Sequence, residues 1–221
     1  MRLSFFGPER SKTAWMIAAA ILALAGIVAA WQVGAFGTSA ATLARSANPE
    51  DRQAAIAALA RTRSQAASQM LTTLAADKDP ATAILAVRAL GDQQAPENQD
   101  VLKRIIADKG LPKLIRSEAA YTMGTFKDAD PAVLTSTLAT DADPEVRAGA
   151  AKGLAKLEMP STIPQLSAAL EDPSPEVRRW AITAIHRMVV RTFPYDATKP
   201  PETQQDVIKR IRDYLKQCKV L

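Results

Sequence analysis

Cysteine and aromatic residues are scarce in this chain. The single cysteine, Cys218, excludes an intramolecular disulfide framework and any cysteine-based metal cluster. Aromatic residues make up only 5% of the sequence and alanine is abundant, a mixture that suits closely packed helices better than a β-sandwich or a barrel. Because 48% of the residues are apolar, the chain can still bury a core. The composition therefore predicts an all-α protein.

Signatures of catalysis and of nucleic-acid binding are also missing. The sequence contains no glycine-rich phosphate loop, nucleophile elbow, zinc-protease helix or paired Cys/His spacing. The formal net charge is +5, but no dense block of lysine and arginine with interleaved aromatic residues occurs. The only histidine, His186, lacks sequence partners for a catalytic or metal-binding role and is better explained by a place near a helix end. We therefore expect no enzyme, no cofactor, no metal site and no nucleic-acid partner.

One long apolar run stands out near the N-terminus. Residues 14–31, AWMIAAAILALAGIVAAW, carry no charged or strongly polar side chain. A helix over residues 13–36 would match a hydrocarbon core of about 30 Å. Because basic residues gather in the preceding segment 1–12, the charge bias places that segment in the cytoplasm. The sequence predicts a single-pass signal anchor in a bacterial-type cytoplasmic (inner) membrane, with the rest of the chain periplasmic.

Two kinds of side chain define this predicted transmembrane helix: aromatic rings at the two interfaces, and small residues on one face where another membrane helix can approach. They are Trp15, Ala19, Ala23, Gly26, Ala30 and Trp31. The alternative is a cleavable signal peptide, because residues 35–37 offer small side chains for a peptidase. In that case the mature protein is a soluble periplasmic adaptor. Residues 37–47 are interpreted as a linker or a partial first helix.

Residues 48–221 contain an internal repeat of about 31 residues. The copies align on one column, which holds Arg52, Ala83, Arg116, Arg147 and Arg178. Three positions later stand Ala55, Ala86, Ala119, Ala150 and Ala181. Seven positions later stand Leu59, Leu90, Met123, Leu154 and Ile185. A separation of four places the alanine and the larger residue on one helix face, where small side chains admit a neighbouring helix.

Each copy is predicted to form a helical hairpin. The first helices have capping residues followed by proline, as helix N-termini favour; the caps are Asn48, Asp79, Asp143 and Ser174. A second apolar-periodic stretch follows each first helix, with breaks expected near residues 62, 92, 126, 158 and 190. Because a lone hairpin cannot bury both faces, about five stacked hairpins predict an α-α superhelix.

The stretch DADPEVRAGAAKGLAKLEMPSTIPQLSAALEDPSPEVR resembles the short HEAT-like repeat of the phycobilin-lyase class. The resemblance covers roughly residues 48–217 and is strongest over 141–188. It implies an α-solenoid used mostly for protein binding, and the family name does not confer lyase activity. It also implies a ladder in which Arg147 and Arg178 are structural. The acceptors that it implies are Asp141, Asp143 or Asp172.

The last repeat departs from this pattern through an insertion at residues 189–201, which contains Phe193 and Tyr195 among prolines. These rings either cover the open end of the stack as a cap or protrude as an aromatic recognition loop. The final helix carries basic residues on its polar side. We interpret these as a solvated face in preference to a contact with anionic lipid.

Together these features predict a membrane-anchored HEAT-repeat scaffold that binds proteins, as an accessory or assembly subunit of a larger membrane complex. Partner contact is expected on the second helices and on the insertion. The candidate protein-binding residues are Thr72, Lys103, Arg104, Thr135, Gln165, Lys209, Arg212, Phe193 and Tyr195. The alternative is a chromophore or cofactor lyase-like protein or chaperone, which should have a pocket with convergent polar groups.

Overall fold

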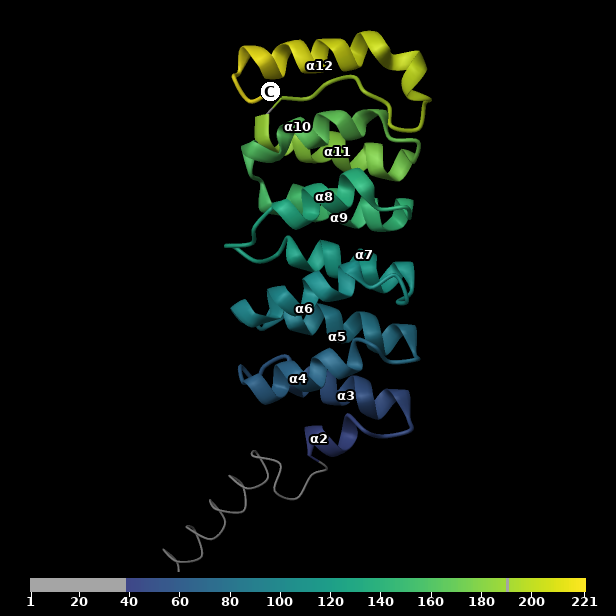
Figure 1. Ribbon diagram of the computed structural model, residues 1–221, viewed down its shortest axis with the longest axis vertical. Coiled ribbons are helices and arrows are strands. Elements are labelled where there is room, and N and C mark those ends of the chain that lie inside the picture. Colours follow the sequence, from purple (N-terminus) through teal and green to yellow (C-terminus); the bar gives the residue numbers. More distant parts are fainter. Residues whose placement is uncertain (1–38, 190) are drawn as a thin grey trace, which may run out of the picture.

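The regular elements of this protein are helices stacked into an elongated body (Figure 1). The computed structural model describes residues 39–189 and 191–221, and within these ranges no strand occurs. The short helix α2 (Ala40–Leu43) lies at one end of the stack and α12 (Gln205–Gln217) at the other. For the described residues, the prediction of an all-α solenoid is confirmed.

Five hairpins make up the stack. Their first helices are α3 (Pro49–Leu59), α5 (Pro80–Asp92), α7 (Lys113–Met123), α9 (Pro144–Leu157) and α11 (Pro175–Val189). Their second helices are α4 (Gln65–Leu74), α6 (Pro96–Ala107), α8 (Ala132–Thr140), α10 (Ile163–Ala168) and α12. Short 3-10 turns flank the last two: η1 (Pro160–Thr162), η2 (Ala169–Glu171) and η3 (Pro201–Gln204). The breaks between the helices fall where the apolar periodicity predicts them.

Capping side chains and prolines determine where the first helices begin. The side chains of Asn48 and Asp79 each accept a hydrogen bond from a backbone N–H in the first turn of α3 and α5, and proline follows each cap. Asp143 is the N-cap residue of α9, as predicted, but its side chain forms no capping hydrogen bond. Its carboxylate instead accepts a hydrogen bond from Arg116 at 2.9 Å, so the ion pair between repeats replaces the capping bond.

The two repeating apolar columns form the interior between successive first helices. Every member of the alanine column is 0% exposed, and the members of the larger column are at most 5% exposed. Small side chains matter most where α7 meets α9, because a Cβ built on Gly124 would lie 2.2 Å from the carbonyl oxygen of Gly153. The two backbones are therefore in direct contact, and any added side chain must push them apart.

The predicted membrane localisation is corrected by the structure. Among residues 39–189 and 191–221, no helix is long and apolar enough to cross a bilayer. The described residues therefore do not support a single-pass placement in the inner membrane with a periplasmic solenoid. The predicted anchor, residues 13–36, and the preceding segment 1–12 lie outside the described residues. So do the residues assigned to that anchor: Trp15, Ala19, Ala23, Gly26, Ala30 and Trp31.

The packing predicts the effect of one substitution in the middle of the stack. Ala150→Leu should lower the free energy of unfolding by about 1–3 kcal/mol, because the larger side chain has no space between the first helices. Urea unfolding followed by circular dichroism measures this. The matched control is Ala57→Leu on the exposed side of α3, which should change stability by no more than about 0.5 kcal/mol. Equal midpoints for the two variants would contradict the packing.

Candidate protein-binding surface

A ladder of ion pairs joins the turns of successive repeats. The pairs are Arg52 with Asp77, Arg116 with Asp141, and Arg147 with Asp172. In each pair the aspartate follows the arginine by 25 residues, so the arginine of one repeat reaches the turn that begins the next. The planar guanidinium suits this role, because its five N–H donors can serve a carboxylate and backbone carbonyls at once. The ladder implied by the resemblance is present.

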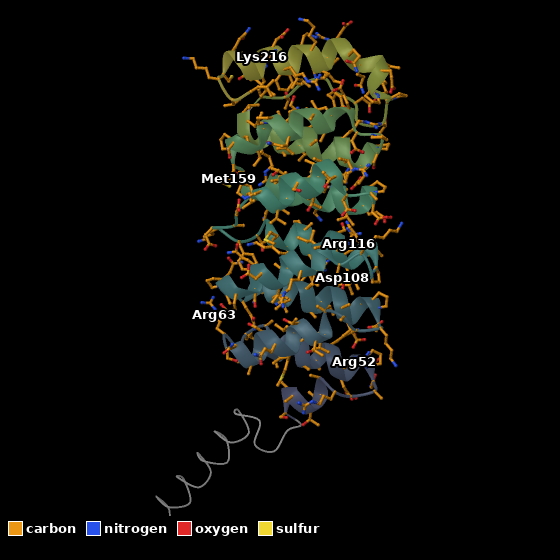
Figure 2. The ribbon with its side chains drawn as sticks, viewed as in Figure 1. Arg52, Arg63, Asp108, Arg116, Met159 and Lys216 are labelled. Atoms are coloured by element: carbon orange, nitrogen blue, oxygen red, sulfur yellow. The ribbon has the colours of Figure 1, made fainter. Side chains whose placement is uncertain are left out.

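The arginines also bind backward along the chain. Arg52 donates to the carbonyl oxygens of Ser46 and Ala47, at 3.0 and 2.9 Å, just before its own helix. Arg147 makes the equivalent bonds before α9. Arg52 and Arg116 lie along one edge of the stack, whereas Arg63 lies on the opposite edge (Figure 2). Along one edge of the solenoid, the ion pairs and hydrogen bonds of the buried arginines therefore hold successive turns together.

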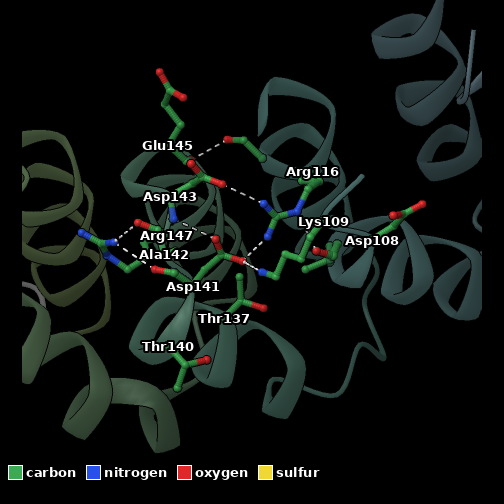
Figure 3. A network of polar contacts seen from close by, with 12 residues as sticks. Asp108, Lys109, Arg116, Thr137, Thr140, Asp141, Ala142, Asp143, Glu145 and Arg147 are labelled. Atoms are coloured by element: carbon green, nitrogen blue, oxygen red, sulfur yellow. Dashed lines mark hydrogen bonds and ion pairs between the residues drawn. The ribbon is translucent and has the colours of Figure 1, made fainter. Parts of the chain in front are cut away.

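Asp141 connects this buried ladder to the surface (Figure 3). Its carboxylate accepts hydrogen bonds from Arg116, from the Lys109 Nζ at 2.5 Å and from the backbone N–H of Asp143 at 3.0 Å. Burial alone would raise the pKa of Asp141. The hydrogen bonds from Lys109 and Asp143 and the two positive charges outweigh burial and hold that pKa below its usual 3.8. The carboxylate is therefore ionised at neutral pH.

At Arg178 the acceptors in the ladder are main-chain carbonyls and not a carboxylate. The resemblance implies an aspartate acceptor, but Arg178 donates instead to the carbonyl oxygens of Ala197 and Lys199, at 2.7 and 3.1 Å, in the insertion. The insertion also places both of its aromatic rings against the stack. The Tyr195 hydroxyl donates to the carbonyl oxygen of Leu170 at 2.5 Å, and the Phe193 ring packs on the core. This arrangement is the one that the cap interpretation requires.

Three grooves lie in succession between neighbouring second helices. The groove between α4 and α6 has a volume of about 410 Å³, that between α6 and α8 about 550 Å³, and that between α8 and α10 about 300 Å³. Hydroxyl, amide, apolar and charged side chains line them. We call these three grooves together the second-helix surface. Among the described residues, no group of His, Cys, Asp or Glu could hold a metal ion.

Comparison with known proteins identifies the family. A family model described as HEAT repeats matches residues 38–124 and 131–213, well over half of the chain. The chain belongs to the HEAT-repeat family. A search of curated proteins finds no match.

The structure of a known protein supports this fold. The chain is similar to the complex of CpcE and CpcF of phycocyanin lyase from Nostoc sp. PCC7120, with 19% identity and a TM-score of 0.50. That alignment covers 70% of this chain and 66% of the other, so it spans slightly less than two thirds of the Nostoc chain. An engineered protein aligns at 19% identity and a TM-score of 0.45, over 78% of this chain and 85% of that one. Human deoxyhypusine hydroxylase aligns at 15% identity and a TM-score of 0.34, over 75% and 90%.

The HEAT repeats place four of the predicted binding residues in the grooves. Thr72 and Arg104 line the groove between α4 and α6, Lys103 lines the next, and Gln165 lines the third. Thr135 lies on α8 but lines none of these grooves, and its hydroxyl donates to a carbonyl in its own helix. The structure therefore brings only part of the predicted set together.

The two predicted residues on the final helix are engaged in ion pairs. Lys209 pairs with Asp213 at 2.7 Å on α12 itself. Arg212 pairs with Glu171 at 2.5 Å and so joins α12 to the preceding repeat. These contacts give Arg212 a packing role in the stack.

Sequence reasoning missed a buried polar link between the first two HEAT repeats. The Gln93 side-chain amide donates to the carbonyl oxygens of Leu59 and Thr62, both at 3.0 Å, and its oxygen accepts from Ser68 and Asn98. A glutamine that ends one helix gives no sequence signal of such a contact. The ladder acceptor Asp77 was also missed, although the constant offset of 25 residues could have revealed it.

The neutral ring of His186 accepts a hydrogen bond from the insertion. This contact differs from the expected one, in which a charged histidine interacts with the helix dipole. The Nε2 of His186 accepts a hydrogen bond from the backbone N–H of Phe193 at 3.1 Å, and the two rings stack with centroids 5.8 Å apart. Burial lowers the pKa of His186 below its usual 6.5. A protonated ring would place a hydrogen on Nε2 and lose this bond to the insertion.

The first prediction from this region concerns the ladder. Arg116→Met should lower the free energy of unfolding by about 3 kcal/mol, because it removes the buried ion-pair partner of Asp141 and leaves the exposed Lys109 as the remaining cation. Urea unfolding measures the change. Arg88→Met is the control, since the Arg88 side chain is 56% exposed in its pair with Glu118 and its loss should cost less than about 1 kcal/mol. An equal loss of unfolding free energy in the two variants would show that the buried ladder pair stabilises the stack no more than an exposed ion pair does.

The second prediction concerns pH. Because the folded-state pKa of His186 is lowered, the unfolded state binds the proton more readily, and stability falls as pH drops below 6.5. Between about pH 7.5 and 5.5 the wild-type chain should lose stability with a slope no steeper than about 1.4 kcal/mol per pH unit. His186→Gln removes the only histidine and should flatten this slope. An unchanged slope in the variant would show that another group titrates.

Proposed function

We propose that this chain is a HEAT-repeat scaffold that holds a protein partner on the second-helix surface. The observation that carries the proposal is the succession of three grooves between α4, α6, α8 and α10. Each groove has room for one or a few side chains. A row of such grooves fits an extended or helical segment of a partner better than a single compact ligand.

A pair of basic side chains on α6 favours an acidic partner segment. Lys103 and Arg104 are neighbours on this helix and line two adjacent grooves. Lys103 has one weak partner, the exposed Asp100 at 3.2 Å, and its side chain is 40% exposed in this ion pair. An exposed ion pair of this kind contributes little free energy, so Lys103 can exchange Asp100 for an acidic group of a partner at little cost. The proposal assigns no catalytic residue to this chain.

The likeness to the phycocyanin lyase complex supports a second candidate function, a lyase-like protein or chaperone that handles a chromophore or cofactor. In the Nostoc structure CpcE and CpcF form a complex, and this chain shares the fold of the matched subunit. The candidate fits the comparisons at least as well as a plain scaffold does. Both candidates require a protein partner. They differ in whether a pigment or cofactor accompanies that partner, which an absorbance spectrum of the purified complex distinguishes.

A charge reversal tests the proposed surface. Lys103→Glu should reduce the amount of co-purifying partner at least about tenfold, because it places a repelling charge between two grooves. Quantitative mass spectrometry of the complex isolated from the native cells measures this. Lys156→Glu on α9 makes the same change of charge at an exposed site on a first helix, outside the three grooves, and should leave the partner bound. Equal loss in the two variants would contradict binding at the second-helix surface.

A further inference from the structure

A separate pocket of about 340 Å³ lies at the capped end of the stack, between the insertion and α12. The insertion crosses beneath α12, as Figure 1 shows. Basic, acidic, aromatic and aliphatic side chains from both elements line the pocket, among them Arg191, Phe193, Val207, Arg210, Asp213 and Tyr214. None of these residues belongs to the second-helix surface.

Two guanidinium groups face this pocket without an acidic partner. The Arg191 guanidinium lies 4.3 Å from the centroid of the Tyr214 ring and 5.4 Å from that of Phe193. Stacking on a ring occupies the flat face of a guanidinium and leaves its in-plane N–H donors for an anion. Arg210 donates to the carbonyl oxygen of Asp206 in its own helix at 3.3 Å. Within residues 39–189 and 191–221, neither arginine forms an ion pair.

The acidic residue of the pocket has a basic partner on its own helix. The Asp213 carboxylate accepts a hydrogen bond from Lys209 at 2.7 Å, one turn earlier on α12. The lining therefore carries two arginines and one carboxylate, a formal charge of +1. This balance suits a monoanion, because the second charge of a phosphate dianion would meet Asp213.

Apolar side chains form the rest of the wall. Phe193 is held edge-on to Tyr214, with centroids 5.5 Å apart, and it stacks on His186 from behind. Val207 packs against the core from the first turns of α12. The apolar part is therefore fixed in place before a ligand arrives, which limits the entropy lost on binding.

We propose that this pocket binds a carboxylate carried beside an apolar side chain on a peptide segment of a protein partner. The inference rests on the proposed function in requiring a protein partner, but it uses a different surface. Arg191 and Arg210 would hold the carboxylate by charge-assisted hydrogen bonds, while Phe193 and Val207 contact the apolar side chain. Such a carboxylate occurs at the C-terminus of a chain or on an internal acidic residue.

Three five-residue peptides that carry an uncharged BODIPY dye at the N-terminus distinguish these sources. All are glycine-serine peptides that end in phenylalanine. The first has a free terminal carboxylate, the second is amidated, and the third is amidated with glutamate before the phenylalanine. Fluorescence anisotropy with the full-length chain should show the amidated neutral peptide binding at least about tenfold more weakly than a charged one. The charged peptide that binds more tightly identifies the source, and equal binding of all three would overturn the proposal.

Matched variants locate the binding site. Arg210→Met and Arg191→Met should each weaken the charged peptide about tenfold. Lys216→Met removes the same charge from an exposed position on the same helix outside the pocket and should leave the dissociation constant unchanged. If Lys216→Met weakened binding of the charged peptide equally, the net charge of the protein and not this pocket would explain the binding, and the proposal would be overturned. Lys103→Glu should leave peptide binding unchanged, so failure of the second-helix surface and failure of this pocket give different results.

Discussion

The stack depends on a buried guanidinium that spans the boundary between two repeats. An isolated charge in that position would be costly, and the chain surrounds it with a carboxylate from the next turn and carbonyls from the preceding one. Arg52 and Arg147 each receive both kinds of partner. Because each arginine fixes the relative position of two turns, the second helices are held at regular intervals. Two of the three grooves, between α4 and α6 and between α8 and α10, lie at junctions held in this way.

The last hairpin uses the same arginine with different acceptors. Arg178 occupies the ladder position, but among the described residues its guanidinium has no aspartate partner. Main-chain carbonyls of the insertion take that place. The insertion thereby brings Phe193 and Tyr195 inward and positions Arg191 beside Tyr214. One departure from the repeat thus both closes the core and creates a pocket with its own chemistry.

The fold could be predicted from the sequence because its signals are local and repeated. The burial of Ala150 follows from a column that recurs in every copy, and helix starts follow from caps and prolines. The site was less predictable. Whether Thr72 or Thr135 lines a groove depends on how neighbouring helices are rotated about their axes, which a polar residue on a helix does not reveal. Likewise, Asp143 reads as a cap, and only the position of Arg116 in space gives it a different partner.

The ladder has one missing step. In the second repeat Ala83 stands in the arginine column, and Asp108, 25 residues later, turns to the backbone N–H of Gly110 instead. The junction between α5 and α7 therefore lacks the buried cross-link that stiffens its neighbours. The groove between α6 and α8, which has the largest volume of the three at about 550 Å³, lies at this same junction. Bending of the rod should concentrate there, so that the two halves of the solenoid hinge about the groove and adjust its width to what it holds.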